Sequence, residues 1–507
     1  MSVSPEGYEK IFFSLSIMDI TRVTYLLFVA VSLIIYWMVP RRIQWIILLA
    51  DSLLFYILNV KAYTFAYLMI SVLSVWGATW VFEKQANLGA KRSALVVTLL
   101  INFGLLAVLK YSTLFANTYN LITKQTSESG LKALNWISSL AISFYTLQIV
   151  SYLLDNYWGV VKREKNPLKL LLFTSFFPLM VSGPIQRYSE FHHQLFDDHR
   201  FEYERVTHGL KRIAIGLFKK LAISNRVALL VDYLWNNPIQ YSGPWIIVAV
   251  IGFVIQLYTD FSGCMDIVIG VSECFGITLS ENFKSPLLSK SIQEFWQRWH
   301  ITLGTWLRDY IMNPILKSRG LITLGSFAKA KLGKKQGKKI PSYLAMLVLW
   351  LAMGLWHGGD WKYIIGEGLW YWFVIVLGQI FEETFKKIRK KTGFFDSFVW
   401  KMIQIIRTNL IFAFGMIFFR ADSVRDSFIR IRLIGSINGF GLHEIKNTVI
   451  SLAKLLQRDG CVVLLLSAII LLIYDVYSYK GKDVIRIVSG KKAHVRWGCY
   501  CLIMIII

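Results

Sequence analysis

Residues 93–115 read SALVVTLLINFGLLAVLKYSTLF, and this stretch decides the fold class. Its only charged side chain is Lys110, and about 20 apolar residues are enough to cross the hydrocarbon core of a bilayer. Because lipid offers the backbone no hydrogen-bond partners, such a segment must satisfy its peptide groups internally, as a helix does. The stretch therefore predicts a transmembrane helix.

Apolar runs of this kind recur along the chain. Of its 507 residues, 55% are hydrophobic and only 17% are charged, whereas a soluble chain carries about 25% charged residues. This composition excludes a soluble enzyme, a fibrous protein and a disordered protein. We expect an all-α polytopic integral membrane protein with about 10–13 transmembrane or re-entrant helices around a central tunnel. The predicted spans are Thr24–Val39, Ile43–Val60, Ala62–Phe82, Ser93–Phe115, Leu134–Leu154, Ser342–Trp356, Tyr363–Phe381, Phe398–Phe419 and Cys461–Tyr477.

Other apolar or mixed segments are irregular. Leu168–Val181 has the length of a half-span, and Trp497–Ile507 is too short for a straight span. Pro244–Tyr258 and Met265–Phe275 flank a predicted polar break at residues 260–263. A short amphipathic N-terminal segment, Ile11–Ile17, is expected to lie in the membrane interface.

The net charge of +25 bears on partners and topology. In a membrane protein it indicates cytoplasmic loops and contact with anionic lipid headgroups, so we expect a lipid bilayer and no nucleic acid as partner. Arg41-Arg42, Lys91-Arg92 and Lys162-Arg163 follow the first, third and fifth spans, which places those span ends in the cytoplasm. Lys317–Lys339, read as a loop with eight cations and no acid, is placed on the same side. His357 then lies toward the outer half of the membrane.

Two histidines are the first candidates for chemistry. His300 follows an Arg298-Trp299 pair, and His357 lies in Gly354-Leu355-Trp356-His357-Gly358. Ionisable residues at membrane depth are costly, and histidine can take a proton from a hydroxyl near neutral pH. The alternative is that each histidine has no catalytic role and is a hydrogen-bonded packing residue. The five cysteines form no CxxC pair, and the His192-His193 segment with its nearby acids is more typical of a solvated face, so no metal is predicted.

Further sequence blocks flank the two histidine motifs. The blocks, in chain order, are Ile142–Gln148 with Ser151–Asp155, Phe177–Tyr188, Gln256–Ile267, Glu281–Phe283, Ser291–His300, Thr305–Tyr310, Gly354–Gly358 and Phe418–Ser423. Together and in this order they resemble the membrane-bound O-acyltransferase (MBOAT) family, and they are nearest to the bacterial branch of the alginate O-acetylation membrane component. The shorter relatives that D-alanylate teichoic acid share the core.

The resemblance implies acyl transfer across a membrane. It implies His357 as the catalytic base and His300 as the second catalytic residue, which binds the thioester carbonyl or, alternatively, only holds its own helix. Substrate contacts are expected from neighbouring residues, and Arg308 with Asp309 either contacts donor phosphates or anchors the cytoplasmic end. The expected substrate-binding residues are Trp296, Trp299, Arg298, Trp356, Arg308, Asp309 and Tyr371. Trp296 and His300 are expected on one helix face, and Glu294 is expected to pair with Arg298.

One block departs from the family pattern. Bacterial relatives often carry a second histidine where this chain has Tyr371, in Gly368-Leu369-Trp370-Tyr371. Tyrosine is a poor base near pH 7, so the base role is concentrated on His357. The implied domains are N-terminal transmembrane helices over 1–160, the catalytic core over 161–430 and a C-terminal helical extension over 431–507.

The sequence therefore predicts an O-acyltransferase of the bacterial plasma membrane, with no bound cofactor. An acyl thioester, with acetyl-CoA expected, is the co-substrate, and an extracytoplasmic cell-surface polysaccharide or a partner transferase accepts the group. The alternatives are D-alanyl transfer from a carrier protein to teichoic acid, a transporter whose path is lined by His300 and His357, and an inactive assembly scaffold.

Overall fold

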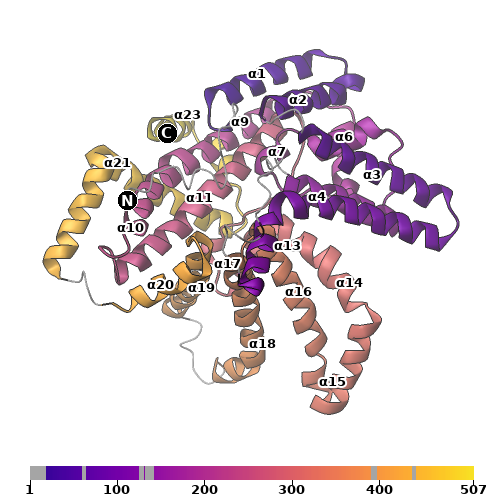
Figure 1. The fold of residues 1–507 in the computed structure, drawn as a ribbon. Helices are drawn as coiled ribbons and strands as arrows, with labels where there is room; N and C mark the ends of the chain where they lie inside the picture. Colours follow the sequence, from indigo (N-terminus) through magenta and orange to yellow (C-terminus); the bar gives the residue numbers. More distant parts are fainter. Residues whose placement is uncertain (1–18, 60–63, 125–130, 132–141, 390–396, 437–440) are drawn as a thin grey trace. The chain divides into compact units, whose positions relative to one another are not determined.

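The computed structural model describes residues 19–59, 64–124, 131, 142–389, 397–436 and 441–507. Within these ranges the chain is built from helices, and the only strand-like pairing is an isolated bridge between Phe283 and Trp299 (Figure 1). The predicted all-α class is confirmed. The N-terminal segment Ile11–Ile17 and the first part of the predicted span Leu134–Leu154, up to residue 141, lie outside the described residues.

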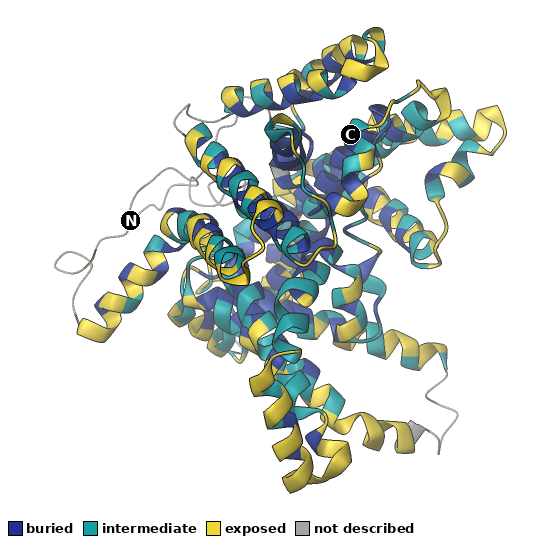
Figure 2. Cartoon of the chain, turned by 90° about the vertical axis from the view of Figure 1, so that its right-hand side faces the viewer, coloured by how far each residue is buried: buried dark blue, intermediate teal, exposed yellow. Residues whose placement is uncertain are grey.

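Eight helical segments of the described chain are long and apolar enough to cross a membrane: Arg41–Asn59, Thr64–Lys84, Leu88–Thr123, Pro244–Cys274, Ile340–His357, Trp361–Lys387, Phe398–Arg420 and Leu442–Tyr479. Many of their apolar residues are exposed, and exposed positions recur along the helices in Figure 2. On α4 (Leu88–Thr123), Val96, Leu100 and Phe103 are all exposed, at the spacing of one helix face. Such faces suit lipid, and the chain is a multi-pass membrane protein.

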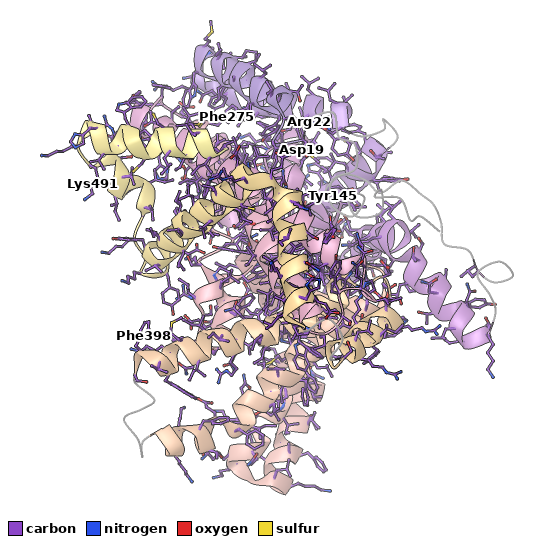
Figure 3. The ribbon with its side chains drawn as sticks, turned by 90° about the vertical axis from the view of Figure 1, so that its left-hand side faces the viewer. Asp19, Arg22, Tyr145, Phe275, Phe398 and Lys491 are labelled. Carbon is purple, nitrogen blue, oxygen red and sulfur yellow. The ribbon has the colours of Figure 1, made fainter. Side chains whose placement is uncertain are left out.

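The chain forms two compact units, and the first comprises residues 1–112, 134–217 and 264–280. The described part of this unit begins at Asp19, just before α1 (Figure 3). The Asp19 carboxylate accepts a hydrogen bond from the Thr21 backbone at 2.8 Å. Its helices are α1 (Val23–Met38), η2 (Arg41–Ile43), α2 (Gln44–Asn59), α3 (Thr64–Lys84), most of α4, α5 (Ile142–Tyr157), α6 (Pro167–Ser175), α7 (Leu179–Ser182), α8 (Tyr188–Phe196), α9 (Tyr203–Leu217) and the end of α11 (Pro244–Cys274). α6 is short and ends at Ser175, which agrees with the predicted half-span.

The second unit comprises residues 113–133, 218–263 and 281–507. Its helices are the end of α4, η3 (Phe218–Ser224), α10 (Asn225–Trp235), most of α11, η4 (Pro286–Leu288), α12 (Ile292–Arg298), α13 (Ile301–Leu307), η5 (Arg308–Met312), α14 (Asn313–Leu316), α15 (Arg319–Gly337), α16 (Ile340–His357), α17 (Trp361–Tyr363), η6 (Ile364–Leu369), α18 (Trp370–Arg389), α19 (Phe398–Arg420), α20 (Val424–Ile434), α21 (Leu442–Tyr479), α22 (Val484–Ser489) and α23 (Ala493–Ile506). α23 has 14 residues, or about 21 Å of helix, shorter than a bilayer core. The three predicted domain ranges stay a prediction.

The predicted polar break at residues 260–263 is wrong, because α11 runs without interruption from Pro244 to Cys274. Its polar side chains find partners that leave the helix intact. Asp260 pairs with Lys220 of η3, and the Thr259 hydroxyl donates to the Ile255 carbonyl one turn back at 2.8 Å. Polar residues in a helix therefore need no change of backbone when their partners are supplied by packing.

The cationic segment Lys317–Lys339 is also corrected, since most of it is helix rather than loop. α15 begins after Ser318, whose hydroxyl accepts a hydrogen bond from the Leu321 backbone at 3.4 Å. Its lysines, alanines and leucines are good helix formers, and charge alone does not oppose a helix that lies in water. Gly333, with a φ of 77°, kinks the helix near its end.

Candidate active site

His357 is the last residue of α16, at the point where the helix gives way to extended backbone. Gly358 follows with φ −180° and ψ 164°, and Asp360 then caps α17 by accepting from the Lys362 backbone at 2.9 Å. The His357 side chain is 16% exposed. The imidazole is thus fixed at a helix end and remains accessible to a substrate.

Glu367 lies beside this histidine. It belongs to η6, a π-helical turn, and its Oε2 is 4.0 Å from His357 Nε2. The carboxyl group is 2% exposed, and its Oε1 has no hydrogen-bond partner among the described residues. π-Helical turns are rare and are frequent at functional sites, where they redirect side chains. Here the turn brings a buried carboxyl group to the histidine.

Glycines allow these segments to approach one another. A methyl group added at Gly354, one turn before His357, would lie 2.7 Å from the Tyr363 carbonyl oxygen, so only glycine admits η6 this close to α16. On the other side of η6, Gly415 of α19 makes room for the Tyr371 hydroxyl. Small residues at helix contacts are the usual means of close packing inside membranes. Gly354 therefore allows η6 to approach α16 closely enough to place Glu367 beside His357.

The C-terminal end of α19 forms another wall of the site. The Phe419 ring meets the His357 ring edge to face, with centroids 5.5 Å apart. Lys362 is buried and donates to the carbonyl groups of Phe419 and Ala421, and Arg420 pairs with Asp232. Cations suit the carbonyl end of a helix. These contacts hold Phe419 against the histidine.

His300 lies in a turn between two helices rather than within one. α12 ends at Arg298 and α13 begins at Ile301, while His300 has φ 47° and ψ 50°. This left-handed conformation is rare for a residue with a side chain. The prediction that Trp296 and His300 share one helix face is therefore wrong, because the backbone turns between them.

Asn282 holds this turn. Its side-chain oxygen accepts from the Thr302 backbone at 3.1 Å and from the Thr302 hydroxyl at 3.0 Å, and it lies 3.3 Å from His300 Nδ1. The Asn282 carbonyl accepts from the Ile301 backbone at 3.1 Å. The Phe261 ring of α11 stands edge to face with the His300 ring, with centroids 4.9 Å apart. A strained turn held by several partners is typical of functional sites.

Electrostatics links the two histidines. Burial lowers the pKa of His300 well below its usual value, and the charge of His357 lowers it further. The His300 ring is therefore neutral and can offer one donor and one acceptor nitrogen. α13, which His300 opens, contacts α16, which His357 ends. Both histidines thus belong to one region of the second unit.

The predicted aromatic contacts form a packed cluster. The Trp296 ring lies 5.0 Å from the Trp350 ring and 4.9 Å from the Tyr371 ring, and Trp299 stacks on Phe295 at 5.5 Å. The Tyr371 hydroxyl donates to the Phe412 carbonyl at 2.9 Å and is buried.

The charged residues predicted to bind substrate also form ion pairs with other residues of the chain. Arg298 binds Glu294 at 3.0 Å, which confirms the predicted ion pair, and lies 4.2 Å from the Tyr479 ring centroid. Arg308 and Asp309 form an exposed pair at 3.1 Å in η5. Trp356 is buried next to His357 in sequence. The substrate-binding roles predicted for these residues and for the aromatic cluster stay predictions.

Two residues of the site were missed by the sequence analysis. Glu367 is the only acid between Lys362 and Phe381, and a lone carboxylate in an apolar segment is a signal that could have been used. Asn282 lies within a recognised block, but its contact with His300 spans 18 residues and no local spacing reveals it. In the described ranges no group of three His, Cys, Asp or Glu residues is arranged to hold a metal ion.

Comparison with known proteins gives a family. Residues 160–329 match the membrane-bound O-acyltransferase family. A peptidoglycan O-acetyltransferase of Helicobacter pylori is 31% identical over 78% of this chain and 74% of its own length. A probable alginate O-acetylase of Pseudomonas syringae pv. tomato is 27% identical over 92% of this chain and 83% of its own length. A teichoic acid D-alanyltransferase of Bacillus subtilis is 30% identical over 50% of this chain and 62% of its own length.

These relatives are bacterial, and their names all describe transfer of an acyl group. The Helicobacter pylori relative is more than 30% identical over most of both chains. Together with the eight apolar helical segments of the described chain, they identify a multi-pass bacterial membrane protein. The chain is an O-acyltransferase and belongs to the membrane-bound O-acyltransferase family.

Proposed function

We propose that this protein transfers an acetyl group from a cytoplasmic acyl thioester, acetyl-CoA, to hydroxyl groups of an extracytoplasmic cell-surface polysaccharide. The observation that carries the proposal is the accessible His357 imidazole beside a buried carboxyl group, in the same unit as the neutral His300. The two relatives that cover most of the chain are named for O-acetylation, of peptidoglycan and of alginate. They support acetyl as the group and a glycan as the acceptor.

In the proposed reaction, His357 takes the proton of the acceptor hydroxyl while the oxygen forms a bond to the thioester carbonyl carbon. The carbon–sulfur bond then breaks, and the leaving thiolate takes the proton back from the imidazolium. The products are an ester and a free thiol, so no other reactant is needed. His300 donates a hydrogen bond to the carbonyl oxygen as negative charge develops on it.

Glu367 acts through His357 in this scheme. Its carboxyl group lies 4.0 Å from the ring and orients it, and when ionised it stabilises the imidazolium that forms during proton transfer. The absence of another partner for Oε1 among the described residues leaves the carboxyl group available for this role. We therefore assign Glu367 as a positioning residue and His357 as the catalytic base.

D-Alanyl transfer to teichoic acid is the second candidate, because the Bacillus subtilis relative is 30% identical over half of this chain. The donor would then be a D-alanyl carrier-protein thioester. The two candidates share the same site and differ in the donor, so the choice of thioester separates them.

The test uses the purified full-length chain in nanodiscs without an ion gradient. Acetyl-CoA, a peptidoglycan or alginate oligosaccharide and, in parallel, a D-alanyl carrier protein are offered, and free thiol and ester are measured. We expect thiol release and ester formation with acetyl-CoA, and loss of both in a folded His357→Ala variant. Use of the D-alanyl carrier alone overturns the acetyl assignment. An intact thioester, with a gradient-driven flux that depends on His357, overturns the enzymatic function.

A further inference from the structure

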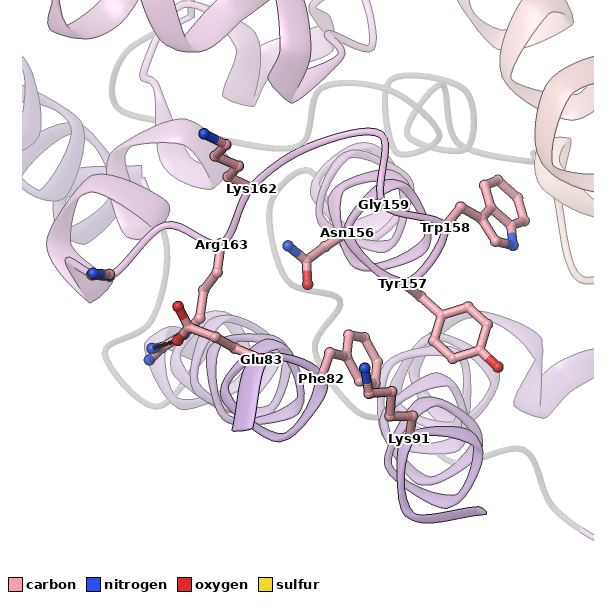
Figure 4. Close-up of a pocket in the computed structure, with 10 residues that line it drawn as sticks. Phe82, Glu83, Lys91, Asn156, Tyr157, Trp158, Gly159, Lys162 and Arg163 are labelled. Atoms are coloured by element: carbon pink, nitrogen blue, oxygen red, sulfur yellow. Dashed lines mark hydrogen bonds and ion pairs between the residues drawn. The ribbon is translucent and has the colours of Figure 1, made fainter. Parts of the chain in front are cut away.

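A cavity of about 560 Å³ lies in the first unit, well away in sequence from the residues of the candidate active site. It is formed by the end of α3, the start of α4, the end of α5 and the segment that follows α5. Its volume falls within the roughly 300–1,000 Å³ that is common for small-molecule sites. The lining residues are Phe82, Glu83, Lys91, Asn156, Tyr157, Trp158, Gly159, Lys162, Arg163 and Lys165 (Figure 4).

Cations dominate this lining. Glu83 is the only acid, and it is already bound to Arg163 at 2.9 Å, while the Arg163 guanidinium also lies 5.1 Å from the centroid of the Trp76 ring. That pair is neutral as a whole. The remaining charge in the cavity is therefore positive.

Three lysines carry this charge. Lys91 comes from α4, and Lys162 and Lys165 come from the segment after α5, so the lining cations belong to two parts of the first unit. Figure 4 shows Lys91 and Lys162 on different sides of the pocket. None of the three forms an ion pair with a carboxylate of the described chain. Like charges gathered round one cavity repel one another, and a bound anion relieves that repulsion.

The mouth of the cavity has the character of a membrane interface. Trp158 is 47% exposed and Val160, two residues on, is 64% exposed. Tryptophan is enriched at the level of lipid headgroups, and basic pockets between transmembrane helices bind anionic headgroups. The cytoplasmic side predicted for Lys91 and Lys162 agrees with this position. An exposed aromatic ring beside unpaired lysines thus favours a lipid over a soluble anion.

We propose that this cavity binds the phosphate headgroup of an anionic membrane lipid. The lysines contact the phosphate oxygens, Asn156 offers a further hydrogen-bonding group, and the acyl chains leave past Trp158 into the bilayer. The same phosphate chemistry is present in the phosphates of a nucleotide thioester such as acetyl-CoA, and the experiment below separates the two sources.

The test uses the full-length chain in detergent and measures the binding of dioctanoyl phosphatidylglycerol, dioctanoyl phosphatidylcholine and CoA. The variant Lys91→Gln/Lys162→Gln/Lys165→Gln removes the three cations. A matched control, Arg42→Gln/Lys84→Gln/Arg92→Gln, removes three exposed cations of the same unit that do not line the cavity. A variant with arginine at the three cavity positions keeps the charge and serves as the rescue.

We expect saturable, salt-sensitive binding of phosphatidylglycerol and none of phosphatidylcholine. Neutralising the cavity lysines should weaken phosphatidylglycerol binding by about tenfold or more, whereas the control and the arginine variant should bind as the wild type does. Equal binding by the neutralised and wild-type chains overturns the site. Displacement of phosphatidylglycerol by CoA overturns the lipid assignment. Thermal unfolding of each variant verifies that it is folded.

Discussion

Replacement of Glu367 by glutamine tests the proposed link between the buried carboxyl group and the catalytic histidine. Glutamine keeps the size of the side chain and an acceptor oxygen but cannot ionise. Two opposite unit charges 4.0 Å apart attract by at most about 4 kcal/mol at an effective dielectric constant of about 20. Each 1.4 kcal/mol corresponds to about a factor of ten in rate, so the upper limit is about a thousandfold.

The observed loss should be smaller than this limit, because glutamine keeps a polar oxygen beside the ring. We expect kcat to fall by about 10- to 100-fold, or about 1.4–3 kcal/mol in transition-state stabilisation. KM for the donor should stay unchanged, since Glu367 stabilises a charge that forms only during proton transfer. Glu367→Asp, which keeps the charge at a greater distance, should lie between glutamine and the wild type.

The assay measures free thiol released from acetyl-CoA with a glycan acceptor, over a range of donor concentrations. Glu382→Gln is the matched control, since Glu382 is an exposed acid on the adjoining α18 whose partner is Lys386. Wild-type kcat in a folded Glu367→Gln protein would refute the role of the carboxylate. A change in KM alone would show that Glu367 acts on donor binding and not on the base.

Three further predictions concern packing, pH and topology. Gly415→Ala places a methyl group against the Tyr371 hydroxyl and should destabilise the protein by about 1–3 kcal/mol in thermal unfolding, whereas Gly378→Ala, with nothing within 4 Å, should not. Burial lowers the pKa of His300, so below about pH 6.5 the unfolded chain binds a proton at this histidine that the folded chain does not bind. The stability measured by thermal unfolding should therefore decrease as the pH falls below about 6.5. The decrease should be smaller in His300→Gln. A cysteine at Gln336 should resist a membrane-impermeant thiol reagent added to intact cells, and ready labelling would contradict the cytoplasmic assignment of the cationic segment.

The candidate site was only partly predictable. His300 and His357 stand out in the sequence because ionisable side chains are rare in apolar segments. The Glu294–Arg298 pair followed from a spacing of four residues within one helix, and the structure confirms it at 3.0 Å. The same rule failed for Trp296 and His300, because Asn282 pulls the backbone at His300 into a left-handed turn. Local spacing holds only while the helix continues.

The sequence alone determined that the protein is helical and lies in the membrane. Lipid cannot satisfy peptide groups, so an apolar segment of sufficient length has no alternative to the helix, whatever its neighbours are. The tertiary structure decided that α11 continues through its polar residues, because Lys220 supplies the partner of Asp260. It also decided that Glu367 faces His357, because a π-helical turn and the close approach allowed by Gly354 set that distance. Such contacts depend on which side chains distant segments bring together, and a one-dimensional pattern does not contain that information.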